Sequence, residues 1–181
     1  MDHVGITRIF NQCFAGSYNT RIVGGADEPL YLPLGLSGQA ELHFREDFAA
    51  SALHEAAHWC IAGAKRRGQR DFGYLYIAPP RSPSQQCRFF AGEVQAQALE
   101  SVFATACNVQ FVLSTDQFGP TAVDCGYFAR RVATTRLAFS RRLAAKPDTC
   151  GARFARALAG ASGTGDVPLT MPPLLVEGAN G

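Results

Sequence analysis

Residues 51–63 read SALHEAAHWCIAG and place two histidines and a glutamate within an otherwise apolar stretch. If this segment is an α-helix, residues four apart lie one turn apart on the same face, so His54 and His58 can bind a single ion. Glu55 lies about 100° around the helix and can reach the open side of that ion. Polar groups in an apolar helix are costly unless they are paired. The His-Glu-x-x-His pattern therefore predicts a metal-binding helix, which we place at residues 48–64.

A second predicted helix, residues 93–107, offers the carboxylate that two histidines need. Catalytic metal sites of this kind usually have a third protein ligand and keep a position open for water or substrate. Glu93 and Glu100 are seven residues apart and so share one face, with Gln97 between them. We expect one glutamate to bind the metal, with Glu93 preferred, and the other to support a ligand. The alternative is that both are solvated surface glutamates.

The donor set of His54, His58 and one glutamate does not identify the metal. Zn²⁺ would activate water for hydrolysis, with Glu55 as the base. The same donors hold Fe(II) in non-haem oxygenases, where the open positions take O₂. From these residues alone, a hydrolase similar to the zinc metallopeptidases is the default hypothesis. A non-catalytic protein-binding module that has lost its metal is a further alternative.

Length and composition favour one compact domain with an ordinary core. The chain has 181 residues and a formal net charge of +2, which is too small to favour nucleic acid as a direct partner. We place a single domain at residues 1–160. Residues 161–181 are rich in Gly, Ala, Ser and Pro and are predicted to form a disordered tail.

Hydrophobic periodicity predicts an α+β fold in which the metal-bearing helix packs on the glutamate-bearing helix beside a small, mostly antiparallel sheet. The expected strands are residues 20–23, 30–32, 41–44 and 71–77, and a further helix is expected at residues 123–143. Three prolines between residues 78 and 88 predict a surface loop.

Two further features favour a cytoplasmic protein that does not contact a membrane. The N-terminal residues lack the basic, then apolar, then small pattern of a signal peptide, and no run approaches the roughly 20 apolar residues of a membrane span. The six cysteines are scattered without a Cys-x-x-Cys pair, a spacing typical of free thiols in a reducing compartment.

Several segments in order along the chain resemble the bacterial elongation factor P hydroxylase family. The matching segments are Phe10–Phe14, Asn19–Arg21, Asp27–Pro33, Ala50–Gly63, Asp71–Tyr74, Glu93–Val94 and Gln97–Glu100. The chain departs from the family pattern at residues 33–44, at residues 108–122 and after residue 160. Those departures affect substrate contacts more than the metal site.

The resemblance implies an oxidoreductase that hydroxylates the lysine of elongation factor P after it has received its β-lysyl group. It implies a metal held by His54, His58 and a glutamate, and hydroxylation of a C–H bond favours Fe(II) over Zn²⁺. The site does not follow the His-x-Asp strand pattern of jelly-roll oxygenases, so 2-oxoglutarate is not implied. The role of Glu55 changes from required base to an open question.

The resemblance also implies where the substrate is recognised. Elongation factor P is generally acidic, so the basic segments at residues 65–70 and 130–142 are candidate docking surfaces. Asp27, Glu28 and Tyr31 are candidates for lining a pocket that accepts a long cationic side chain. A plain turn at residues 27–29 is the alternative.

Overall fold

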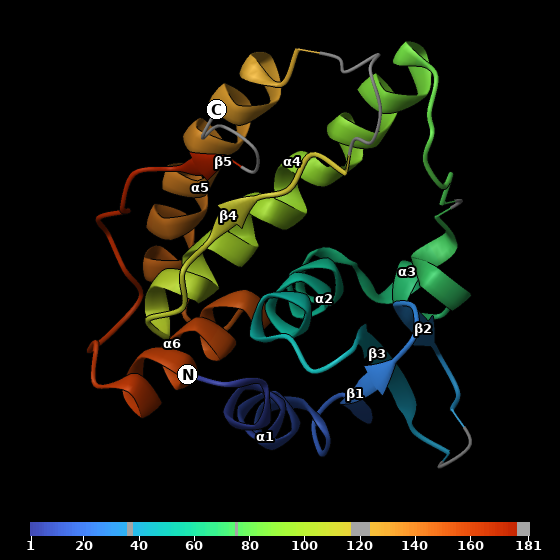
Figure 1. Ribbon diagram of the computed structural model, residues 1–181. Helices are drawn as coiled ribbons and strands as arrows, with labels where there is room; N and C mark the ends of the chain where they lie inside the picture. The colour runs from blue at the N-terminus through green and yellow to red at the C-terminus, as the bar shows by residue number, and fades with distance from the viewer. Residues whose placement is uncertain (36–37, 75, 117–123, 177–181) are drawn as a thin grey trace.

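The computed structural model describes residues 1–35, 38–74, 76–116 and 124–176 (Figure 1). It has the α+β fold class predicted from the sequence, a helical body with a small sheet at one side. In chain order the elements are α1 (His3–Phe14), β1 (Thr20–Ala26), β2 (Leu30–Leu32), β3 (Ala40–Arg45), α2 (Ala49–Ile61), α3 (Ala64–Arg67), η1 (Arg70–Gly73), α4 (Pro83–Ala106), β4 (Val112–Leu113), α5 (Gly126–Ala145), α6 (Cys150–Ser162) and β5 (Leu175–Val176).

The three-stranded sheet is mixed, which corrects the prediction of a mostly antiparallel one. Its strand order is β1-β3-β2, with β3 parallel to β1 and antiparallel to β2. The turn between β1 and β2 is short, but β3 inserts between them and so pairs with both. Leu42 at the centre of β3 is fully buried and pairs with Ile22 on one side and Tyr31 on the other.

Side chains occupy both edges of this sheet. At the β1 edge, Asn11 of α1 accepts a hydrogen bond from the Ile22 amide at 2.8 Å and donates to the Ile22 carbonyl at 3.3 Å. At the β2 edge, the Tyr31 amide donates to Asp71 Oδ1 at 2.8 Å. These bonds satisfy backbone groups that an edge strand would leave available for pairing with another chain. They also fix α1 and η1 against the sheet.

Helix α2 lies near the centre of the molecule, between α4 on one side and α1 and α6 on the other (Figure 1). Trp59 anchors its apolar face, with ring centroids 5.2 Å from Phe10 and 4.6 Å from Phe14. The ring of Phe154 in α6 contacts the rings of Phe10 and Phe14, and also that of Phe103 in α4. All five aromatic side chains are fully buried. This aromatic cluster holds α2 in place.

Helix α4 begins at Pro83, ten residues before the predicted start at Glu93, so part of the predicted loop is helical. Ser82 caps the helix by accepting from the Gln85 amide, and the Gln85 side chain accepts from the Ser82 amide in return. Proline is favoured at the first helical position because it has no N–H to leave unsatisfied there. Of the three prolines only Pro83 was misinterpreted, because it starts the helix, while Pro79 and Pro80 lie in the loop before it.

The strand predicted at residues 71–77 is also wrong over the part that is described; residue 75 lies outside the described residues. Residues 70–73 form the short helix η1, in which Asp71, Phe72 and Gly73 all have positive φ, at 49°, 56° and 71°. Phe72 is buried, with its ring stacked on Tyr31 at 4.3 Å between centroids. The alternating aromatics reflect a tight turn pressed onto the sheet.

Residues 163–176, which composition assigns to a disordered tail, make defined contacts in the structure. Val167 is buried, Arg136 donates to the Pro172 carbonyl at 2.7 Å, and β5 pairs in parallel with β4. Residues 177–181 and the first residue of the helix predicted at 123–143 lie outside the described residues, and α5 is described from Gly126. Among the described residues, no helix has the length and apolar character to cross a bilayer.

Candidate metal centre

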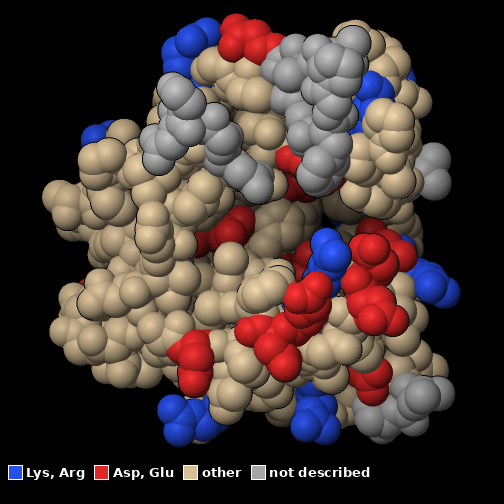
Figure 2. All heavy atoms as spheres, in the orientation of Figure 1, with Lys and Arg blue, Asp and Glu red and all other residues tan. Residues whose placement is uncertain are grey.

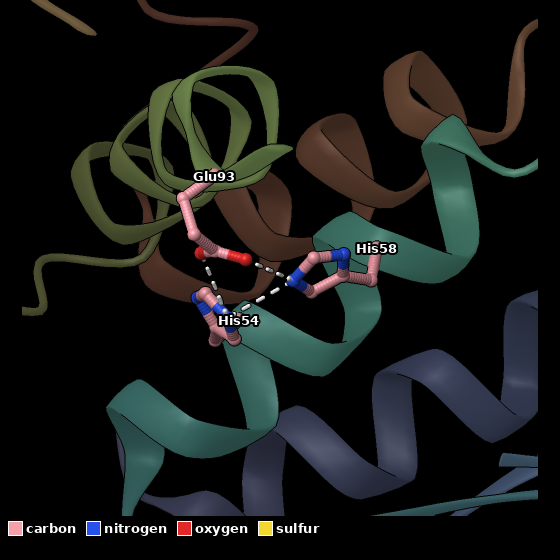
Figure 3. Close-up of side chains that lie close together, drawn as sticks. All are labelled: His54, His58 and Glu93. Atoms are coloured by element: carbon pink, nitrogen blue, oxygen red, sulfur yellow. Dashed lines mark hydrogen bonds and ion pairs between the residues drawn. The ribbon is translucent and has the colours of Figure 1, made fainter. Parts of the chain in front are cut away.

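His54 and His58 lie one turn apart on the face of α2 that meets α4, and Glu93 projects toward both from α4 (Figure 3). The two Nε2 atoms are 3.1 Å apart. Glu93 Oε1 is 3.2 Å from His58 Nε2, and its Oε2 is 3.5 Å from His54 Nε2. Three potential ligand atoms therefore converge on one point between the helices.

The spacing and charge of this cluster fit a bound metal ion. Ligand atoms on one ion, at bonds of about 2.0–2.2 Å and angles between octahedral and tetrahedral, lie roughly 3–3.5 Å from each other. The separations of 3.1, 3.2 and 3.5 Å match this range. Glu93 and Glu100 also bring two mostly buried carboxylates to the histidines, with side chains 12% and 10% exposed. A divalent cation would offset that negative charge.

Glu100 contacts the opposite side of the His54 ring. Its Oε2 lies 2.8 Å from His54 Nδ1, a separation typical of a charge-assisted hydrogen bond. When the ring carries a single proton, that proton lies on Nδ1 and is donated to this carboxylate, which leaves the Nε2 lone pair available to a metal. Carboxylate partners of this kind orient ligand histidines in many metal sites. Glu93 and Glu100 thus occupy two different positions around His54.

The carboxylates dominate the electrostatics of the metal-free cluster. Burial lowers the pKa of His54, but the charges of Glu93 and Glu100 outweigh it and raise that pKa to about 10. Burial raises the pKa of Glu93, but the charge of His54 and the hydrogen bond with His58 bring it down to about 2. Burial is the main reason that the pKa of Glu100 is raised. Without a metal, the cluster retains a proton on His54 to balance its carboxylates.

Gln97 is a residue of the site to which the sequence assigned no role. Its side chain is 2% exposed and donates to Glu93 Oε2 at 3.4 Å and to the Ser114 carbonyl at 2.9 Å. Its Oε1 accepts from the Ser114 amide at 3.1 Å. An amide side chain four residues after Glu93, on the same helix face, is the sequence signal that points to it.

Glu55 is half-buried beside the cluster. Burial raises the pKa of its carboxyl group, and the charges of His54 and His58 oppose that rise. The Glu55 carboxyl group is therefore close enough to the two histidines to interact with them electrostatically. A carboxyl group with a raised pKa beside the two histidines fits a role in proton transfer.

The residues predicted to bind substrate lie on and under the β1–β2 connection. Asp27 and Glu28 are exposed, and neither makes a hydrogen bond or ion pair with the cluster among the described residues. Tyr31 is 3% exposed, and its hydroxyl donates to the Arg67 carbonyl at 2.9 Å. The substrate contact predicted for Tyr31 would require this side chain to leave the core.

The surface view shows acidic side chains gathered over the sheet and the connection from β3 to α2 (Figure 2). They lie to one side of a hollow near the centre of this face, at the level where α2 and α4 meet in Figure 1. The exposed acidic residues of this region include Asp27 and Glu28 on the β1–β2 connection, and Glu46 and Asp47 on the β3–α2 connection. The face of the molecule near the cluster is thus more favourable for cations than the net charge of +2 implies.

Three arginines of the two predicted basic docking segments have structural roles. Arg66 lies 3.5 Å above the Tyr74 ring, and Arg67 lies 3.7 Å above the Trp59 ring and donates to the Trp59 carbonyl. Arg136 is 8% exposed. The exposed arginines of the second segment are on α5: Arg130, Arg131, Arg141 and Arg142.

Two imidazoles and a carboxylate on packed helices define the protein as a candidate metalloprotein, and the comparisons with known proteins identify the group. Residues 9–164 match the family model described as elongation factor P hydroxylase. The chain belongs to this family. The match includes both helices that carry the cluster.

A curated relative is the elongation factor P lysine hydroxylase of Haemophilus influenzae, which is 44% identical over 128 residues. The alignment covers 70% of this chain and 72% of the relative. Family membership and this identity confirm the predicted resemblance and the enzyme class: the protein is an oxidoreductase of the hydroxylase type.

Proposed function

We propose that the protein is a metal-dependent hydroxylase that adds one oxygen atom to the β-lysylated lysine of elongation factor P. The observation that carries the proposal is the convergence of His54, His58 and Glu93, with donor atoms within 4.8 Å of one another, in a member of the elongation factor P hydroxylase family. The overall change replaces a C–H bond with C–OH, and it consumes O₂, two electrons and two protons and releases water.

Three residues of the cluster bind the metal, and a fourth orients one of these ligands. His54 Nε2, His58 Nε2 and a Glu93 oxygen bind the metal, while Glu100 holds the His54 ring through Nδ1. Fe(II) supplies the redox chemistry with O₂ that hydroxylation needs and that Zn²⁺ lacks. Leu53 and Ala57 are fully buried next to the histidines and form an apolar surface on α2 that excludes water. Glu55 holds or transfers a proton beside the metal.

Charge recognises two parts of the substrate: the modified side chain and the surface of the protein that carries it. Asp27 and Glu28, with the other carboxylates on the same face, attract the two ammonium groups of the β-lysyl-lysine side chain. The exposed arginines of α5 contact acidic surface elsewhere on elongation factor P. This substrate places the enzyme in the cytoplasm, where translation factors act.

Mass spectrometry of β-lysylated elongation factor P tests the proposal directly. The substrate is incubated with protein purified anaerobically and loaded with Fe(II), in the presence of O₂ and a chemical reductant. We expect the modified lysine to gain one oxygen atom and His54→Ala to abolish that gain. His43→Ala is the matched control, because His43 pairs with Glu41 on the sheet and lies outside the cluster.

The same preparation separates this proposal from hydrolysis by zinc. Protein that carries stoichiometric zinc, cleaves peptides and takes up no O₂ would contradict the hydroxylase assignment and favour the metallopeptidase-like alternative. Protein that binds no metal with its histidines intact would favour a non-catalytic binding module.

A further inference from the structure

A pocket of about 240 Å³ opens next to His58, on the side of the cluster that faces α3 and η1. It lies between α4 and the C-terminal end of α2 and is lined by His58, Ile61, Ala62, Arg66, Tyr74, Ala91, Gly92, Gln95 and Ala96. Pockets for drug-sized ligands measure roughly 300–1,000 Å³. This one suits a single long side chain rather than a resident organic cofactor.

The α4 wall of the pocket contains a glycine that packing does not explain. Gly92 lies in the interior of α4, where glycine is less stable than alanine. A Cβ atom built on Gly92 would meet nothing within 4 Å, and its φ is not positive. Neither a close neighbour nor backbone geometry requires a glycine there. The missing side chain leaves space in the pocket.

The opposite wall is held by a strained turn. Asp71 and Phe72 adopt positive φ, a conformation that is strained for residues other than glycine. Arg66 donates to the Phe72 carbonyl at 3.0 Å and to the Tyr74 hydroxyl, and it lies over the Tyr74 ring. These contacts hold Tyr74 6.4 Å from His58 between ring centroids.

We propose that this pocket binds the aliphatic stem and the amide link of the β-lysylated lysine, with Gly92 kept free of a side chain to admit it. The proposal rests on the proposed function and assigns its substrate a binding subsite. Ile61, Ala62, Ala91 and Ala96 provide small apolar surfaces for the methylene groups, and the Gln95 amide can bond the peptide-like link. His58 at the inner wall brings the stem next to the metal.

Arg66 gives the pocket a preference for the modified lysine. An unmodified lysine would place its Nζ ammonium among the walls of a pocket that already contains the Arg66 guanidinium, and like charges repel. After β-lysylation the same nitrogen belongs to a neutral amide, and the ammonium groups lie further along the chain. The subsite therefore recognises the link itself.

Gly92→Leu tests the subsite by filling it. We expect the variant to fold with unchanged iron content and to raise the KM for β-lysylated elongation factor P at least tenfold. Anaerobic binding of this substrate should weaken by a similar factor. Gly160→Leu is the matched control: Gly160 is an exposed glycine of α6 whose Cβ would also meet nothing within 4 Å. It should match wild type in KM.

Gly92→Ala keeps the proposal testable if leucine disturbs the neighbouring Glu93. It should raise thermal stability, as Gly160→Ala should, but also raise KM several-fold, which the control should not. Wild-type hydroxylation together with an unchanged KM in Gly92→Ala and Gly92→Leu would overturn the subsite and leave the proposed function standing. Failure of the wild type to add oxygen would instead overturn the proposed function.

Arg66→Met tests the preference for the modified lysine through anaerobic binding alone. The ratio of the Kd for unmodified elongation factor P to that for the β-lysylated form should fall at least tenfold. Arg66→Lys retains the positive charge and should restore most of the ratio. Equal ratios in wild type and Arg66→Met would contradict the role of Arg66.

Discussion

The two faces of α2 are built from different chemistry. One face directs His54 and His58 toward the carboxylates of α4, with the two Nε2 atoms 3.1 Å apart. The other buries Trp59 completely among the rings of Phe10 and Phe14. Apolar burial on the second face offsets the cost of burying polar and charged groups at the first. The structure thus separates the residues that position the helix from those that bind, and mutation can test that separation.

The largest expected effect is loss of metal from the histidine face. Glu93→Ala removes a proposed ligand, and we expect metal affinity to fall by more than the roughly 10–100-fold that loss of an outer partner costs. Anaerobic titration with Fe(II), or with Co(II) as a spectroscopic substitute, measures this. The metal-free variant should still unfold cooperatively. Wild-type metal affinity in Glu93→Ala, with loss of binding in Glu100→Ala, would reverse the roles of the two glutamates.

The preference for Glu93 illustrates what the sequence could and could not predict. Helical spacing was enough to place His54 and His58 on one face, and the seven-residue interval put Glu93 and Glu100 on one face of α4. Spacing alone could not decide which glutamate meets the Nε2 atoms, because that depends on how far α4 is shifted along α2. The structure brings Glu93 to both Nε2 atoms and Glu100 to Nδ1.

The elements that were predicted poorly are those whose pattern has two physical interpretations. Pro83 reads as a loop residue but is equally suited to the first turn of a helix once Ser82 and Gln85 form a cap. Phe72 and Tyr74 alternate like a strand, yet the positive φ of Phe72 turns the chain back onto Tyr31. The first case was decided by a cap between near neighbours in sequence, and the second by a contact with Tyr31, which is distant in sequence.

The next largest effect should come from the aromatic face. Phe154→Ala removes a fully buried ring that contacts Phe10, Phe14 and Phe103, and such truncations cost about 3–5 kcal/mol of unfolding free energy. Urea unfolding of the metal-free protein measures the loss. Below the unfolding transition, metal affinity should stay within a few-fold of wild type. A parallel loss of metal affinity and stability would show that the two faces are not separable.

The smallest effect concerns the back of the metal site, where Glu100 contacts His54 Nδ1. Glu100→Gln keeps an oxygen that can accept the Nδ1 proton but removes the charge, so His54 keeps its orientation and becomes a weaker donor through Nε2. We expect metal affinity to fall by about tenfold, while Glu100→Leu, which also loses the hydrogen bond, should approach a 100-fold loss. Titration with Fe(II) under argon distinguishes the three proteins. If Glu100→Gln bound metal as weakly as Glu93→Ala, Glu100 would be a ligand in its own right, and the two sides of the His54 ring would not differ in function.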